Sequence, residues 1–117
     1  MRIMTQLHEL IDSYNDYIKK VPAGCQKIAD RLREDMIVEA MKDIINFSEG
    51  ANWLSQASTF FQQNGISVDL ETEKIHDYLN EINNGLEIQD YIVVADMFEY
   101  EILPFFEENL SDVKLNS

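Results

Sequence analysis

The apolar side chains of residues 5–33 recur at alternating steps of four and three positions. The seam consists of Leu7, Ile11, Tyr14, Ile18, Val21, Cys25, Ile28 and Leu32. This period places all of its members on one face of an α-helix and excludes a strand, whose side chains repeat every two residues. Pro22 cannot donate a backbone hydrogen bond and clashes with the preceding turn. Because the seam keeps its phase across Pro22, we expect one kinked helix and not two separate ones.

The remainder of the chain contains three further helical segments separated by turn signals. A second seam predicts a helix from about 36 to 64, with Asp35 as its N-cap and Asn64-Gly65 as its stop. Ile66 is then expected to pack back on the helix. A third helix is expected over about 70–84, and a fourth from about residue 86 onward.

The boundaries of the last two helices follow from local signals. Asp69 is a candidate N-cap for the third helix, and Asn84-Gly85 supplies its expected stop. Ile88 opens the predicted seam of the fourth helix, and Pro104 is expected to bend that helix near its end. Residues 111–117 are polar and are expected to form a frayed tail.

These elements predict an all-α fold. Short turns make consecutive helices antiparallel neighbours, so we expect an up-down four-helix bundle of two αα-hairpins with a kinked first helix. A weak internal similarity at an offset of 50 residues agrees with two hairpins. Residues 1–117 are expected to form a single domain, because this length leaves little room for a second core.

Charge is distributed unevenly along the chain. Residues 1–42 carry seven acidic and seven basic side chains, whereas residues 43–117 carry fifteen acidic side chains against Lys74 and Lys114, which leaves the chain at −13. Nucleic acid and anionic membranes bind basic surfaces, so neither is expected as a partner. The acidic side chains would attract a basic protein, although solubility alone is the simpler explanation for them.

No signal peptide or membrane-spanning stretch is evident, and Cys25 has no second cysteine with which to form an internal disulfide. A cytoplasmic location is therefore expected. Cys25 lies three residues after Pro22, where a helix N-terminus would favour a reactive thiolate. Its position in the seam favours core packing instead.

The segment from Ala95 to Pro104, together with Val21-Pro22-Ala23-Gly24-Cys25, resembles small uncharacterised helical proteins of Gram-positive bacteria. The resemblance spans most of the chain and implies an all-helical bacterial protein of the cytoplasm. It implies no activity, cofactor or catalytic residue.

Asp96 and Glu99 share one helix face and form the most interesting acidic pair. Bundles that hold two metal ions collect inward-pointing carboxylates, and Glu49 or His76 could add ligands here. However, the sequence contains no His-x-x-x-His motif, and His8 and His76 are its only histidines. The alternative is that these carboxylates pair with basic side chains (Arg31, Arg33 or Lys27) or accept hydrogen bonds from tyrosine hydroxyls. The chain also lacks a phosphate-binding loop and a nucleophile elbow, so no catalytic residue and no cofactor are predicted.

Two helices carry a second apolar stripe opposite the main seam. The stripe of the second helix contains Gly50, Trp53, Ala57 and Phe60, and that of the fourth contains Val93, Met97, Tyr100 and Pro104. A helix at the edge of an isolated bundle needs only one apolar face, and tryptophan, tyrosine and methionine are enriched in interfaces. The simpler explanation is a wide contact with the other two helices.

From these stripes we expect a small protein–protein interaction module, an adaptor or chaperone-like bundle that holds a basic or amphipathic partner helix. A homodimer is a second form of the same hypothesis. The alternatives are a metal- or small-molecule-binding bundle centred on Asp96 and Glu99, and an acidic decoy that mimics nucleic acid.

Overall fold

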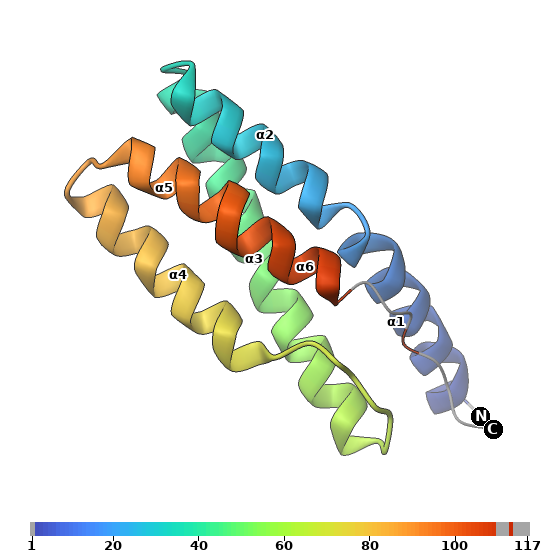
Figure 1. Ribbon diagram of the computed structural model, residues 1–117. Coiled ribbons are helices and arrows are strands. Elements are labelled where there is room, and N and C mark those ends of the chain that lie inside the picture. The colour runs from blue at the N-terminus through green and yellow to red at the C-terminus, as the bar shows by residue number, and fades with distance from the viewer. Residues whose placement is uncertain (1, 110–112, 114–117) are drawn as a thin grey trace.

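The computed structural model describes residues 2–109 and 113, and all regular structure in these residues is helical. The elements are α1 (Arg2–Ile18), α2 (Val21–Arg33), α3 (Ile37–Gln63), α4 (Thr72–Glu87), α5 (Tyr91–Met97), the π-helix η1 (Phe98–Ile102) and α6 (Leu103–Glu108). These elements make up four rods, because α1 and α2 follow one another in one bent rod, and α5, η1 and α6 follow one another in another (Figure 1). The molecule measures 50 × 21 × 21 Å. The predicted all-α fold with four helices, one of them bent, is confirmed.

The bend of the first rod lies just before Pro22. Helix α1 ends at Ile18, Lys19 and Lys20 form a turn, and α2 begins at Val21. Because Pro22 has no N–H, it cannot donate to the carbonyl of Ile18, and the helical ladder is interrupted there. All eight residues of the predicted seam are nevertheless buried, with at most 7% of their surface exposed. The interruption therefore bends the rod without turning its apolar face away from the core.

The turn between α2 and α3 is closed by the end of α2. Asp35 has a positive φ of 63°, and the N–H of Met36 donates to the carbonyl of Arg31 at 2.9 Å. This is the Schellman arrangement, in which a left-handed residue satisfies the last carbonyls of a helix. The expected N-cap role of Asp35 is wrong, because Met36 occupies the N-cap position of α3 and no side chain caps it.

The same arrangement ends the next two helices. Gly65 has a φ of 75°, and the N–H of Ile66 donates to the carbonyl of Phe61 at 2.9 Å, so α3 stops where predicted. Ile66 is buried, as expected. At the end of α4, Gln89 takes the left-handed position with a φ of 57°. The turns at Asp35 and Gln89 are 54 residues apart, which does not support the internal similarity at an offset of 50.

Helix α4 continues past the predicted stop at Asn84-Gly85. Gly85 is buried within the helix, and a Cβ atom at this position would lie 2.7 Å from Cγ2 of Val94. Glycine is therefore needed here for close packing against α5 and not for chain reversal. Asp69 does not cap α4 either, because the N-cap position belongs to Glu71, whose side chain makes no capping bond.

The fourth rod begins at Tyr91, later than predicted. Asp90 caps α5, since its Oδ1 accepts a hydrogen bond from the N–H of Val93 at 3.2 Å. Ile88 therefore precedes this rod and is 74% exposed, although the sequence places it in the seam. The π-helical turn η1 ends two residues before Pro104, where the sequence predicts a bend. A π-helical turn is a recognised cause of helix irregularity, as is proline.

One core runs through the bundle. Phe47 of α3 contacts Phe98 of η1 and Phe106 of α6 edge-to-face, with ring centroids 5.1 and 6.2 Å apart. Most of the predicted frayed tail (111–117) lies outside the described residues. Val113 is described, is buried, and exchanges two hydrogen bonds of 2.9 and 3.0 Å with the Asn15 side chain.

Candidate functional site

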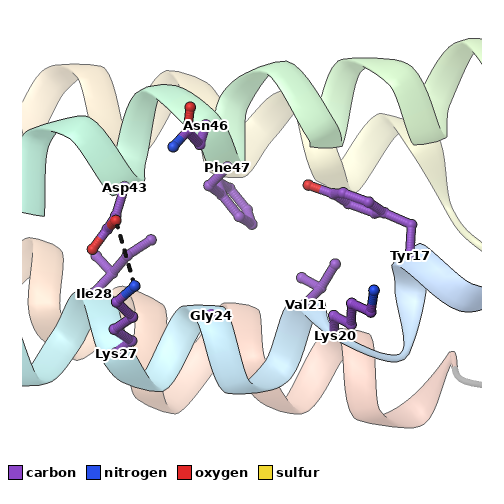
Figure 2. A pocket seen from close by; sticks show the side chains of 9 residues that line it. All are labelled: Tyr17, Lys20, Val21, Gly24, Lys27, Ile28, Asp43, Asn46 and Phe47. Atoms are coloured by element: carbon purple, nitrogen blue, oxygen red, sulfur yellow. Dashed lines mark ion pairs between the residues drawn. The ribbon is translucent and has the colours of Figure 1, made fainter.

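A hollow lined by nine residues lies between α2 and α3 (Figure 2). Its volume is about 200 Å³. The α2 side contributes residues that follow one another at helical spacing, and the α3 side contributes Asp43, Asn46 and Phe47. We refer to this hollow as the α2–α3 groove.

The walls of the groove are largely apolar. Val21 and Ile28 are buried, and Figure 2 shows the rings of Phe47 and Tyr17 directed into the space between the two helices. The Phe47 ring packs edge-to-face against Phe98 of the core. Core packing therefore holds the groove wall that Phe47 forms in place. Tyr17 contacts Trp53, with the ring centroids 5.8 Å apart. The groove is therefore shaped by side chains that the core keeps in place.

Gly24 lines the groove on α2. It lies inside the helix, and a Cβ atom built on it would meet nothing within 4 Å. Glycine inside a helix costs about 1 kcal/mol relative to alanine, and neither a close contact nor a positive φ requires it here. The visible consequence of Gly24 is open space in the groove.

The rim of the groove is polar and carries two ammonium groups. Lys27 Nζ lies 3.9 Å from Asp43 Oδ1, and Asp43 Oδ2 also accepts a hydrogen bond from Arg31. Lys20 makes no ion pair with any described residue. The carboxylate of Asp43 is thus already neutralised, whereas Lys20 is available to an incoming anion.

The predicted acidic pair is joined to α2 by one arginine. Arg33 donates from Nη2 to Asp96 Oδ1 and from Nη1 to Glu99 Oε1, both at 2.8 Å, and Gln26 donates to Glu99 Oε1 at 2.7 Å. The hydrogen bond from Gln26 and those from Tyr100 and Arg33 lower the pKa of Glu99 to about 2. The carboxylates of Asp96 and Glu99 are therefore paired with protein side chains, as the alternative to the metal hypothesis predicts.

The other two candidate metal ligands lie elsewhere. Glu49 borders a shallow hollow on α3 beside Gly50 and Trp53. His76 of α4 faces Ser55, with Nε2 3.4 Å from Oγ. Nowhere in residues 2–109 and 113 do three His, Cys, Asp or Glu side chains gather closely enough to hold a metal ion. The structure does not bring the four residues of the metal hypothesis together.

The stripe of α3 is mostly covered. Ala57 is buried, and Trp53 is half-buried beneath α1, where it contacts Tyr14 and Tyr17. Phe60 remains 42% exposed. A large part of this stripe therefore serves the contact with the first rod.

The second apolar stripe of the last rod is likewise partly buried and partly exposed. Met97 is buried, whereas Tyr100 is 66% exposed with the Arg33 guanidinium 5.8 Å above its ring. Phe60 and Tyr100 do not adjoin, because Tyr100 lies beside Arg33 at the end of α2. Phe60 is 24 residues along the chain from Met36, which follows that end, and this corresponds to about 36 Å of helix.

Cys25 is fully buried, and desolvation raises the pKa of its thiol to about 12. The thiol is therefore protonated at neutral pH and packs as a small apolar side chain, so the reactive alternative is not supported.

Apart from Val93, sequence reasoning missed a set of exposed aliphatic side chains at the α2–α3 and α4–α5 turns. Its members are Met36, Val38, Ile88, Ile92 and Val93, of which the least exposed shows 38% of its surface and the most exposed 74%. Figure 1 places both turns at the same end of the molecule, away from the first turns of α1. We refer to these five residues as the hairpin-end cluster. The signal that could have revealed it is the density of β-branched residues just after each turn.

Acidic side chains accompany this cluster. Residues 34–39 and 87–93 contain Glu34, Asp35, Glu39, Glu87 and Asp90 and no basic residue. The nearest arginine along the chain, Arg33, is occupied by Asp96 and Glu99.

Within residues 2–109 and 113, no helix combines the length and the hydrophobicity needed to cross a bilayer.

Comparison with known proteins identifies a family. The family described as Domain of unknown function (DUF8042) matches residues 9–110, so the chain belongs to that family. No curated protein and no solved structure matches the chain.

Proposed function

We propose that this member of the DUF8042 family is a protein–protein interaction module, an adaptor or chaperone-like protein, whose docking surface is the hairpin-end cluster. The observation that carries the proposal is the exposure of five large apolar side chains at one end of a small molecule. Scattered exposed apolar residues are ordinary, but a group of them edged by charged residues is typical of an interaction site.

The partner that fits this end is a basic amphipathic helix. Its apolar face would cover the aliphatic side chains, and its lysine or arginine residues would meet the five carboxylates of the two turns. A second copy of this chain fits less well, because each copy brings a charge of −13 and the same acidic end. The homodimer is therefore an outcome that the experiment must distinguish.

Of the five residues that the sequence predicts to contact a partner, only Tyr100 is part of the proposed surface. Tyr100 lies on the same rod as Val93, seven residues further on, so it extends the surface along the molecule. Phe60 lies near the other end of α3 and provides an independent comparison. Trp53, Ala57 and Met97 support the fold beneath these surfaces.

The same proposal includes an up-down bundle of two αα-hairpins, α1/α2 with α3 and α4 with the last rod. The two tight turns and the reversal of the chain at each of them support it (Figure 1). A cytoplasmic location in Gram-positive bacteria is also part of the proposal, on the resemblance noted above.

The test measures binding of a labelled helical peptide of leucine and lysine by fluorescence anisotropy, with a leucine and glutamate peptide as the charge control. Replacing both Ile88 and Ile92 by serine should weaken binding of the basic peptide about tenfold, since each loses apolar contact area. Phe60→Ser removes an exposed apolar group of the same class and should leave the affinity unchanged. Added salt should weaken binding of the basic peptide.

Three results would contradict the proposal. They are equal binding of the acidic peptide, a larger effect of Phe60→Ser than of the double variant, and no saturable binding at all. Light scattering over a range of protein concentrations distinguishes a homodimer from a monomer by its mass. A mass that doubles in the wild type and not in the double variant would assign this end to self-association.

A further inference from the structure

We propose that the α2–α3 groove is a binding site for a small amphipathic carboxylate, whose aromatic or branched apolar group enters the groove and whose carboxylate meets Lys20. This site lies away from the hairpin-end cluster and prefers the opposite charge. It is therefore independent of the proposed partner surface.

The dimensions of the groove suit one compact apolar group. A cavity of 150 Å³ lined by apolar side chains is large enough to hold benzene, and the groove provides about 200 Å³. Val21, Ile28 and the ring of Phe47 supply apolar contacts on both sides (Figure 2). A ligand whose ring or branched chain has about five or six carbons, close to the size of benzene, would fill this space.

The charges at the rim select the polar group of the ligand. Asp43 is the acidic residue that lines the groove, and Arg31 and Lys27 already engage it. An amine would therefore find no free carboxylate there. Lys20, which also lines the groove, has no ion-pair partner among the described residues, so a carboxylate would meet its ammonium group. The groove therefore favours an acid over an amine or a neutral alcohol.

Gly24 is exposed and provides a second observation, which is that the space beside it is open. The helix tolerates a weakly helix-forming residue at a position where alanine would meet no atom within 4 Å. A larger side chain here would project into the groove, as the position of Gly24 between Val21 and Ile28 in Figure 2 indicates. Glycine at this position keeps the groove accessible.

The experiment uses amide proton–nitrogen correlation spectra of the full chain titrated with phenylacetate and with isovalerate. At least one of the two acids should give saturable shifts at Gly24 and its groove neighbours. For about ten non-hydrogen atoms, a dissociation constant on the order of 1 mM is expected. Phenethyl alcohol and phenethylamine test the charge preference, and both should bind at least about fivefold more weakly than phenylacetate.

Matched variants locate the site. Gly24→Leu fills the groove and should abolish the saturable shifts, whereas Ala23→Leu makes a comparable enlargement at a position of the same helix that does not line the groove and should leave them unchanged. Gly24→Ala, which is compatible with the helix, should weaken binding by a smaller factor and provides the test if the leucine variant does not fold. Lys20→Gln should weaken binding about fivefold, and Lys42→Gln makes the same change of net charge outside the groove and should have no effect.

The proposal is overturned if neither acid gives saturable shifts, or if the alcohol binds as well as the acid. It is also overturned if folded Gly24→Leu or Gly24→Ala binds as the wild type does, or if the affected amides lie away from the groove.

Discussion

Gly85 of α4 lies directly against Val94 of α5, so that a methyl group at position 85 would stand 2.7 Å from Cγ2 of Val94. Gly24 of α2 is also helical, yet a methyl group there would meet nothing within 4 Å. The same residue type therefore occupies two different environments in this chain. At position 85 it permits two helices to approach, and at position 24 it leaves a groove open.

The first prediction compares alanine at these two glycines. Gly24→Ala should raise the free energy of unfolding by about 0.5–1 kcal/mol, because alanine is the better helix former and no clash opposes it. Gly85→Ala should lower it by about 1 kcal/mol, because the overpacking against Val94 exceeds the gain in helix propensity. Urea unfolding followed by far-ultraviolet circular dichroism measures both. Equal changes in the two variants would mean that the close contact at Gly85 does not persist in solution.

The second prediction concerns the pH dependence of Glu99. Its pKa of about 2 lies below the ordinary value of 4.5, owing to hydrogen bonds from Gln26, Tyr100 and Arg33. A lowered pKa in the folded state stabilises the fold above the ordinary value, and this contribution is lost as the pH falls from about 4.5 through 2. Glu99→Gln should therefore be less stable than the wild type at neutral pH, and the difference should disappear near pH 2.

Urea unfolding of both proteins across this pH range measures that difference. Glu107→Gln is the control, because Glu107 is exposed and makes no ion pair with the described residues, and its effect should stay within about 0.5 kcal/mol. A difference for Glu99→Gln that is independent of pH would contradict the assignment.

The third prediction is that the Cys25 thiol is inert in the folded protein. Burial raises its pKa to about 12, and no part of the side chain reaches solvent. Reaction with a disulfide reagent at neutral pH should therefore be limited by opening of the fold, and should accelerate strongly when urea unfolds the chain. Absorbance of the released thiolate follows the reaction. Rapid labelling without urea would show that the first rod opens at its bend.

The fourth prediction concerns Asp35 and Gln89, which are the two residues other than glycine with a left-handed backbone in the described part of the chain. Asp35 has a φ of 63° and Gln89 a φ of 57°, and side chains other than asparagine and aspartate are strained in this region. Gln89→Gly should therefore stabilise the protein by about 1 kcal/mol, and Asp35→Gly by less. Gly65→Ala, at a φ of 75°, should destabilise it by about 1 kcal/mol. Thermal and urea unfolding test this order, and a destabilised Gln89→Gly variant would refute it.

Local sequence signals determined much of the fold. The seam from Leu7 to Leu32 was sufficient to place eight side chains in the core, because a helical period on one face leaves no other way to bury them. Pro22 located the bend, and Gly65 located the end of α3, because each imposes a backbone constraint that its neighbours cannot remove.

The same local signals failed where a residue type has two uses. Asn84-Gly85 resembles a helix stop, yet Gly85 serves a contact with Val94, a residue of another rod. This error moved the predicted start of the last rod and placed the exposed Ile88 in the core. Asp35 resembles an N-cap, but its backbone closes the preceding helix instead.

The candidate sites depended most on tertiary structure. The sequence showed that Asp96 and Glu99 share a face, but it could not show that Arg33, more than sixty residues earlier, would neutralise both. It likewise could not show that Gly24 faces a hollow. Periodicity along a chain determines which face of a helix is apolar, whereas a cavity or an ion pair depends on the packing of separate helices. The amino-acid sequence therefore determined the rods and their inner faces, and the tertiary structure decided what their outer faces can bind.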